Sequence, residues 1–472
     1  VGADISGSTK LNVYQGSAGV ISGNVAYASI SNNGNSDITL EGVNLTAKDI
    51  NAIAKDTTTT NLNAIGVSAG GVALGALAAE AANNSDISIT LTGNTVTSES
   101  EAGDEESGNI NISTDKANTV AAEAIGVAGG AIGGTGMGAT VSDNGSSVIT
   151  LIGNTMQADK NIDVAAQTNS ELTANISNDA AGVFGGGAVS IAEVNAGSAN
   201  DRMATAVIIG NGNTFAAQNT NIGAASNITQ SVDLDALSIS GYGALSGNTA
   251  TVNAYTDVGI NVVKESAEEN SNTYKGAADG ESSDVNFNAE NNVEQTSSVA
   301  GITASGLIAS GTNIGETNSD LKTNVSLNGS SDSSNGSSDS SKINSLTVNA
   351  NSKADVTNNV NGDGGSAIDA SPYAAQSTNN VKSDTTVNMS GKWTVAGDMD
   401  VNALHENNID IIADALKASV VGYSGVHSDN TVTNNTAVKL DNASVATGGS
   451  QDISARNTID YDSSVTGSGY GV

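Results

Sequence analysis

Short runs along the chain alternate strictly between apolar and polar residues. Ile87, Ile89 and Leu91 are separated by Ser88 and Thr90, and residues 109–112 alternate in the same way. A period of two is typical of half-buried β-strands, in which every second side chain points into the core. The predicted core side chains are Ile87, Ile89, Leu91, Ile110, Ile112, Val148, Leu151, Ile162 and Val164.

These runs belong to a unit that repeats along the chain. Residues 65–98 return as residues 125–158, an offset of 60 residues (125 − 65). Each unit has a Gly/Ala/Val-rich lead, an ITLxGNT piece and a closing piece such as NINIS or NIDVAA. The pattern predicts eight units, at about 19–64, 65–124, 125–180, 181–238, 239–301, 302–367, 368–419 and 420–472, with inserted loops at 98–107, 264–284 and 328–342.

A regular period of this size is typical of repeat proteins. The strand-like pieces are short and are separated by turns rich in Gly, Asn and Asp. If the chain coils so that each strand lies on its own copy in the next turn, every backbone group finds a partner. We therefore predict one all-β domain over residues 1–472, a right-handed parallel β-helix (β-solenoid) in the form of an elongated rod. Turns of about 20 residues would give a rod about 110 Å long, and two larger turns per unit remain an alternative.

The lead segment has a helical alternative, because Val72–Ala82 contains good helix formers. Its copy in the next unit carries Gly133, Gly134, Gly136 and Gly138, which destabilise a helix. Since copies of a repeat share one conformation, we expect closely packed strands in both.

Composition narrows the possible partners. The chain has 472 residues and a net charge of −34, which disfavours nucleic acids and anionic membranes. It has no Cys, and its longest apolar run is too short to span a membrane as a helix. Disorder is the alternative for so polar a chain, but the alternating β-branched runs argue against it.

No catalytic residues are assigned. His405 and Glu406 begin an HExxH pattern whose second His is missing, so His405 is expected to be a solvated residue at a strand end. A polysaccharide-active β-helix would need paired carboxylates, basic groups and aromatic platforms. Trp393 is the only Trp and the chain is poor in Arg, which makes this enzyme class the least favoured hypothesis.

Calcium is the one cofactor that the sequence leaves open. Two acidic loops offer the carboxylate oxygens that Ca²⁺ prefers, and their candidate ligands are Asp104, Glu105, Glu106, Glu268 and Glu269. Neither loop has the D-x-D-x-D-G spacing of a regular calcium loop. Solvated acidic loops without a metal are therefore the favoured interpretation.

The repeat signature resembles that of very large secreted adhesins of Gram-negative bacteria. The segments AIGVSAGGVALGALAAEAANNSD, ITLTGNTVTSES and NINIS or NIDVAA look like repeats of filamentous-haemagglutinin-like and leukotoxin-like exoproteins. The resemblance covers essentially the whole chain and concerns architecture more than activity. It implies a right-handed β-helix shaft that is exported through an outer-membrane pore and displayed at the cell surface.

The resulting functional hypothesis is a structural shaft of an exported adhesin or extracellular filament. Its expected partners are further solenoid segments or protomers stacked end to end, together with a surface receptor or glycan. The alternative is a calcium- or glycan-binding module that uses the acidic and Ser-rich loops.

Overall fold

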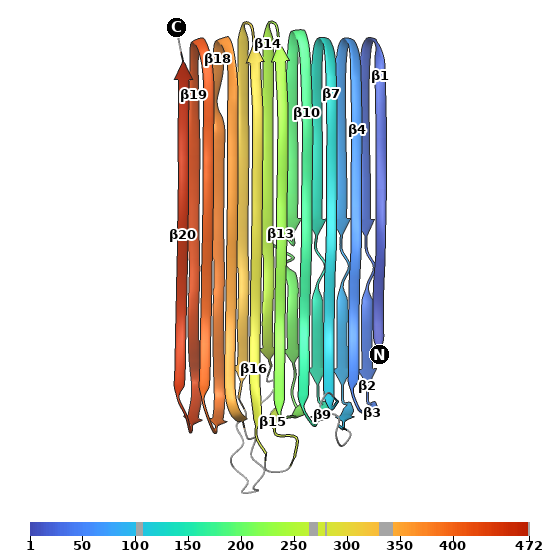
Figure 1. The fold of residues 1–472 in the computed structure, drawn as a ribbon, viewed down its shortest axis with the longest axis vertical. Coiled ribbons are helices and arrows are strands. Elements are labelled where there is room, and N and C mark those ends of the chain that lie inside the picture. Colours follow the sequence, from blue (N-terminus) through green and yellow to red (C-terminus); the bar gives the residue numbers. More distant parts are fainter. Residues whose placement is uncertain (101–106, 264–271, 279–280, 330–342, 471–472) are drawn as a thin grey trace.

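The computed structural model describes residues 1–100, 107–263, 272–278, 281–329 and 343–470, and every helix or strand assigned within them is a β-strand (Figure 1). None of the described residues forms a helix that could span a membrane. The strands are β1 (Gly2–Asn32), β2 (Ser36–Glu41), β3 (Asn44–Ala47), β4 (Ile50–Asn83), β5 (Ile87–Thr92), β6 (Thr95–Ser98), β7 (Asn109–Asp143), β8 (Ser147–Ile152), β9 (Thr155–Ala158), β10 (Asn161–Ala196), β11 (Met203–Ile209), β12 (Thr214–Ala216), β13 (Asn219–Ser240), β14 (Gly243–Val262), β15 (Thr273–Lys275), β16 (Ser283–Ser305), β17 (Ile308–Asn328), β18 (Ile343–Val395), β19 (Met399–Thr447) and β20 (Gln451–Tyr470).

The chain winds as a flattened right-handed solenoid with two long walls (Figure 1). In each turn it runs up a front wall, bends over a narrow edge and descends a back wall. The first part of β10, up to Gly182, pairs with β13, whereas its second part, from Gly186, pairs with β14. The long strands therefore belong to both walls and bend at this edge.

All strand pairings are parallel and keep equivalent residues in register. Ile50 lies beside Ile110, and Ile110 beside Ile162. The front wall is formed by β1, β4, β7, β10, β13, β16, β18, β19 and β20. The fold class predicted from the sequence, an all-β parallel solenoid, is confirmed.

The expected turn size was wrong. The register offset between neighbouring turns runs from 51 residues, at Gly2 and Ile53, to 65 residues, at Asn219 and Asp284. One repeat unit is therefore one turn, and neither the three nor the two turns per unit are correct. Period-two alternation reveals strands but not where a strand ends, so two walls joined through a bend were interpreted as separate short turns.

This change alters the shape. A front strand such as β13, with 22 residues, spans about 70 Å. Nine front strands at the usual spacing extend only about 40 Å along the solenoid axis. Over the described residues the molecule is thus a slab wider than it is long, not a rod of about 110 Å.

The GNT signature forms the lower corner of each turn. Gly93, Gly153 and Gly212 have positive φ angles of 63°, 64° and 77°, which glycine adopts without a steric penalty. After this bend the chain enters β6, β9 or β12, which belong to a separate five-stranded sheet at the base. The predicted stacking of the signature is confirmed, because Thr95, Thr155 and Thr214 pair in register.

The interior contains the alternating apolar side chains of both walls. Among the predicted core residues, the buried ones are Ile87, Ile89, Leu91, Ile110, Ile112, Leu151, Ile162 and Val164. Val148 is the exception, since it pairs with outward-facing Ser88 and is only half-buried, while Ile149 takes the inward place beside Ile89. The run SVITLI has two adjacent apolar residues, so its inward phase is fixed by the register and not by the pattern alone.

The lead segment is a strand, as expected. Ala73, Leu74, Ala76 and Ala78 pair in register with the four glycines from Gly133 to Gly138. Glycine also lets the two walls approach each other closely. A Cβ added at Gly66 would lie 2.8 Å from Leu77 Cδ1, and one added at Gly126 would lie 2.1 Å from Met137 Cε.

Candidate functional sites

A line of polar side chains runs through the middle of the core. One inward position of the front wall is polar in seven successive turns, and we call this line the polar seam. Its members are Asp56, Lys116, Thr168, Ser226, Asn291, Ser352 and His405, which follow one another in register. All seven are buried, and the seam separates two apolar clusters of the interior.

The seam is held by hydrogen bonds to the opposite wall. Thr205 Oγ1 donates to Thr168 Oγ1 at 2.7 Å, and Asn291 Nδ2 donates to Thr256 Oγ1 at 2.9 Å. Buried polar groups are costly unless they are paired, and these bonds form only when the two walls are correctly aligned. The seam therefore fixes the register of one wall against the other.

His405 corrects an expectation from the sequence, because it is fully buried in the middle of β19 and not at a solvated strand end. Its Nδ1 accepts a hydrogen bond from the Ser383 hydroxyl at 3.0 Å, and its Nε2 donates to Asn407 Oδ1 at 2.7 Å. Burial lowers the pKa of His405, partly offset by the bond to Asn407. The HExxH comparison excluded a zinc site but carried no information on burial.

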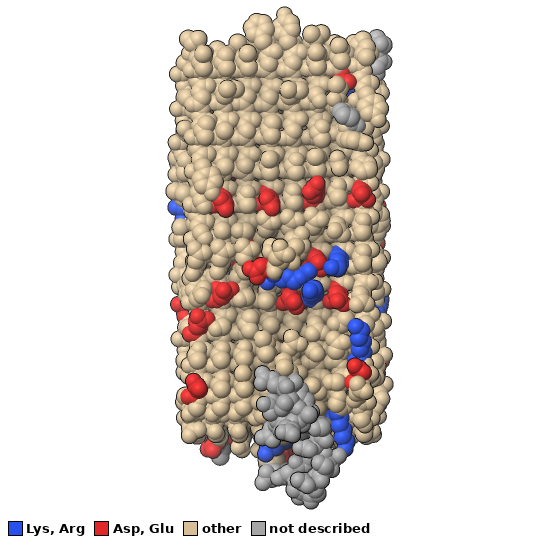
Figure 2. Space-filling model, turned by 180° about the vertical axis from the view of Figure 1, so that it is seen from behind, with Lys and Arg blue, Asp and Glu red and all other residues tan. Residues whose placement is uncertain are grey.

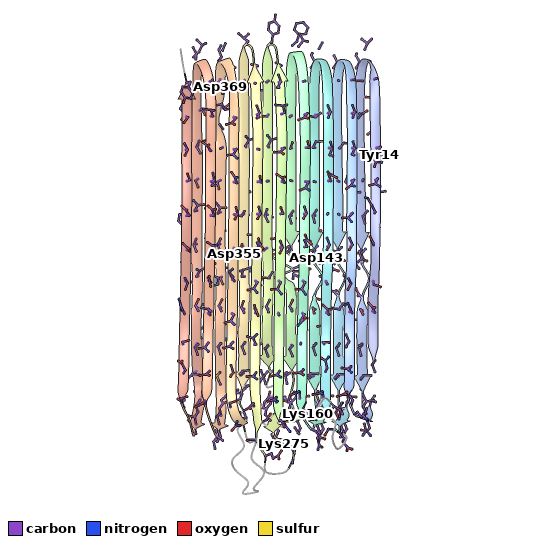
Figure 3. The ribbon with its side chains drawn as sticks, in the orientation of Figure 1. Tyr14, Asp143, Lys160, Lys275, Asp355 and Asp369 are labelled. Atoms are coloured by element: carbon purple, nitrogen blue, oxygen red, sulfur yellow. The ribbon has the colours of Figure 1, made fainter. Side chains whose placement is uncertain are left out.

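The seam is charged only at Asp56 and Lys116, near its first turns. Lys116 Nζ lies 2.7 Å from Asp143 Oδ1 on the opposite wall, in a fully buried ion pair. Asp56 is the neighbour of Lys116 on the adjacent front strand and accepts a hydrogen bond from Ser85. Figure 3 labels Asp143 midway along the long walls, far from the edges of the slab. The Lys116–Asp143 pair resembled solvated charges in the sequence, because the two residues are 27 positions apart.

A second buried ladder runs along the lower corner. The side-chain amides of Asn94, Asn154, Asn213 and Asn272 follow one another, with Nδ2–Oδ1 distances of 3.0, 3.1 and 3.1 Å. Each Oδ1 of the last three also accepts the backbone N–H of the preceding Asn. The Asn of the GNT signature is therefore structural, and the repeat itself was the signal that could have predicted the ladder.

Acidic side chains on the back wall are spaced apart. One outward column reads Ser29, Glu80, Thr140, Glu193, Thr251, Glu316, Thr378 and Asp429. From Glu80 on, carboxylates occupy every second turn, about 9.6 Å apart. Figure 2 shows a row of acidic side chains across this wall. The spacing keeps like charges from becoming direct neighbours, which would destabilise a ladder.

The two faces at the ends of the solenoid axis expose residues that belong to interior columns. On β20, Ile459, Tyr461 and Val465 are 51%, 46% and 49% exposed, although their register neighbours on β19 are buried. On β1, Ile21 and Val25 are 79% and 78% exposed. Within the described chain, β1 and β20 each pair along one side only in the front wall.

The sequence-predicted calcium ligands Asp104, Glu105, Glu106, Glu268 and Glu269 lie outside the described residues. Among the residues that are described, no three His, Asp or Glu side chains gather as a metal site. Trp393 is 4% exposed and donates from Nε1 to the Ser390 carbonyl oxygen at 2.9 Å, so its ring is a core side chain and not an open platform for a sugar.

Comparison with known proteins adds no name to this geometry: the chain matches no protein-family model, no curated protein and no solved structure.

Proposed function

We propose that the chain is a segment of the structural shaft of an exported surface adhesin or extracellular filament. The observation that carries this proposal is that the interior columns continue without interruption from one end face to the other. One column reads Ala3, Ala54, Thr114, Ala166, Ala224, Ala289, Ala350, Ala403 and Ala455. A column of this kind can be extended by any further turn of similar sequence.

The end faces also suit each other in charge. Asp4 on β1 and Arg456 on β20 belong to one outward column, and Lys10 and Asp462 belong to another, six residues further along both strands. If β1 of a second copy continued the register of β20, Asp4 would meet Arg456 and Lys10 would meet Asp462. The first of these columns already contains such a pair between turns, Lys55 and Asp115, at 3.3 Å.

We further propose that solenoid turns, from a second copy or from the same kind of shaft, stack on these end faces. Unpaired strand edges bind other strands readily, and the exposed apolar columns would be buried by stacking. Surface display, adhesion and export are part of the proposal through the resemblance of the repeats. A receptor or glycan would bind away from the stacked faces.

Electron microscopy and sedimentation of the chain comprising residues 1–472 test the stacking. Fibres with a repeat near 4.8 Å along their axis are the expected result. Arg456→Asp should shorten them, and Asp4→Arg combined with Arg456→Asp should restore them. Lys353→Asp, which makes the same charge change in the middle of the front wall, serves as the control.

Particles that stay monomeric at high concentration, or a double variant that is not restored, would contradict stacking in this register. The same measurement with and without a calcium chelator tests the alternative. Fibres that disassemble only on chelation would favour the calcium-binding hypothesis for the acidic loops.

A further inference from the structure

The buried charges of the polar seam are arranged for a reaction between side chains. Lys116 Nζ donates to Asp143 Oδ1 at 2.7 Å and to the Gly145 carbonyl oxygen at 2.7 Å. Neither Lys116 nor Asp143 has any solvent exposure. A Cβ added at Gly145 would lie 2.6 Å from Lys116 Nζ, so the glycine leaves room for the amine beside the carboxyl group.

A second carboxyl group completes the arrangement. Asp56 is the register neighbour of Lys116, faces the same interior and is also fully buried. Its Oδ2 accepts hydrogen bonds from Ser85 Oγ and, at 3.4 Å, from Asn118 Nδ2. Its Oδ1 is buried and has no hydrogen-bond partner among the described residues. Burial raises the pKa of the Asp56 carboxyl, which favours the protonated acid.

The three side chains have different supports. Asp143 accepts from Ser170 Oγ at 2.7 Å, from the Gly145 N–H at 3.2 Å and from Asn83 Nδ2 at 3.3 Å. Its carboxyl group is therefore held in one orientation toward the amine. Asp56 is held by one oxygen and keeps the other available for proton transfer.

We propose that Lys116 and Asp143 are joined by an intramolecular amide bond that forms once the chain has folded, with Asp56 as the proton-transfer group. This inference goes beyond the proposed shaft function and does not depend on it. It assigns a covalent modification to the interior of the slab.

The chemistry balances without any further reactant. A proton passes from the Lys116 ammonium to the Asp143 carboxylate across their hydrogen bond, which gives an amine and a carboxylic acid. Nζ attacks Cγ of Asp143, and Asp56 donates its proton to the departing oxygen while the Cγ–O bond breaks. Asp56 then regains a proton from the nitrogen, and one water is released. Fixed proximity of this kind gives intramolecular reactions a large advantage.

The bond would join the two walls within one turn. Lys116 lies on the front part of β7 and Asp143 at the end of its back part, so the closed loop passes over the narrow edge. In a shaft under tension, this turn could not open even if the surrounding hydrogen bonds broke.

Mass spectrometry of the full chain tests the proposal directly. The intact protein should be lighter than its sequence mass by one water, about 18 Da. Trypsin cannot cleave after a lysine whose amine is acylated. The digest should therefore contain a single peptide covering residues 56–160 with the same mass deficit, in place of separate peptides 56–116 and 117–160.

Matched variants separate this bond from other losses of water, such as ring closure at an aspartate. Lys116→Arg should abolish the deficit, whereas Lys55→Arg, at an exposed ion pair on the neighbouring strand, should leave it unchanged. Asp56→Asn, which conserves shape, should leave most of the chain unlinked and cleavable after residue 116. A wild-type protein with its full sequence mass would overturn the proposal, and complete linkage in Asp56→Asn would overturn the role of Asp56.

Discussion

Asn154 and Asn213 lie one above the other at the lower corner of successive turns, with 3.1 Å between Asn154 Nδ2 and Asn213 Oδ1. Asn154 Nδ2 also donates to the Leu91 carbonyl oxygen at 2.8 Å, and Asn154 Oδ1 accepts from the backbone and side chain of Asn94. One side chain thus joins three turns and satisfies the backbone of a sharp bend.

Asn154→Ala should therefore be strongly destabilising. It leaves buried donors and acceptors of two neighbouring turns unpaired, and we expect a loss of about 3 kcal/mol in the free energy of unfolding. Urea denaturation followed by circular dichroism measures this loss. Asn227→Ala is the control, because Asn227 stands in an exposed ladder between Asn169 and Asn292, where water replaces the lost bonds. Equal losses for the two variants would contradict a special role of burial.

The bend between the walls depends on glycine at a few positions. A Cβ added at Gly130 would lie 2.0 Å from the Gly70 carbonyl oxygen of the previous turn, a distance that no relaxation of side chains can relieve. Gly130→Ala should lower the unfolding midpoint clearly, by about 2 kcal/mol or more.

Gly136→Ala is the matched control for this prediction. Gly136 belongs to the same strand, and nothing lies within 4 Å of a Cβ placed there. Alanine restricts the unfolded chain, so this variant should be neutral or stabilised by up to about 1 kcal/mol. A destabilised Gly136→Ala together with a neutral Gly130→Ala would show that the bend is not where the register indicates.

His405 should make stability depend on pH. Burial lowers its pKa in the folded protein below the value of about 6.5 that it has when unfolded. As pH falls below about 6.5, the unfolded chain binds the proton first, so the folded state loses stability between that pH and the lowered pKa.

Urea midpoints measured from pH 8 to pH 5 check this expectation. The wild type should fall more steeply than His405→Gln, since glutamine does not titrate. His427→Gln should behave like the wild type, because His427 is exposed. A His405→Gln variant with the same pH profile as the wild type would contradict the prediction.

The spacing of acids on the back wall leads to a prediction about salt. Thr140 separates Glu80 from Glu193, and Thr140→Glu would place three carboxylates on adjacent strands. We expect a loss of about 1 kcal/mol at low ionic strength that largely disappears in 1 M salt, where charges are screened. Thr140→Gln, with a side chain of similar size and no charge, should show no such salt dependence.

Much of the architecture could be predicted from the sequence, because repetition and period-two alternation are local properties. The runs around Ile87 and Ile110 identified strands, and the recurrence of Gly93-Asn94-Thr95 identified a stacked corner. The turn size could not be predicted in the same way. The bend near Gly70 and the one at Gly93 look alike in a sequence, and only the pairing of Ile50 with Ile110 shows that a whole unit separates neighbouring turns.

The candidate sites divide along the same line. The sequence by itself determined the parallel stacking of like residues, the polar corner ladder and the acidic surface, since each follows from residue types that recur at a fixed interval. Only the tertiary structure decided that Val148 faces outward, that His405 is buried and that Lys116 meets Asp143. Those contacts join opposite walls, and which residues face each other across a core depends on where the chain bends, a property that no local pattern contains.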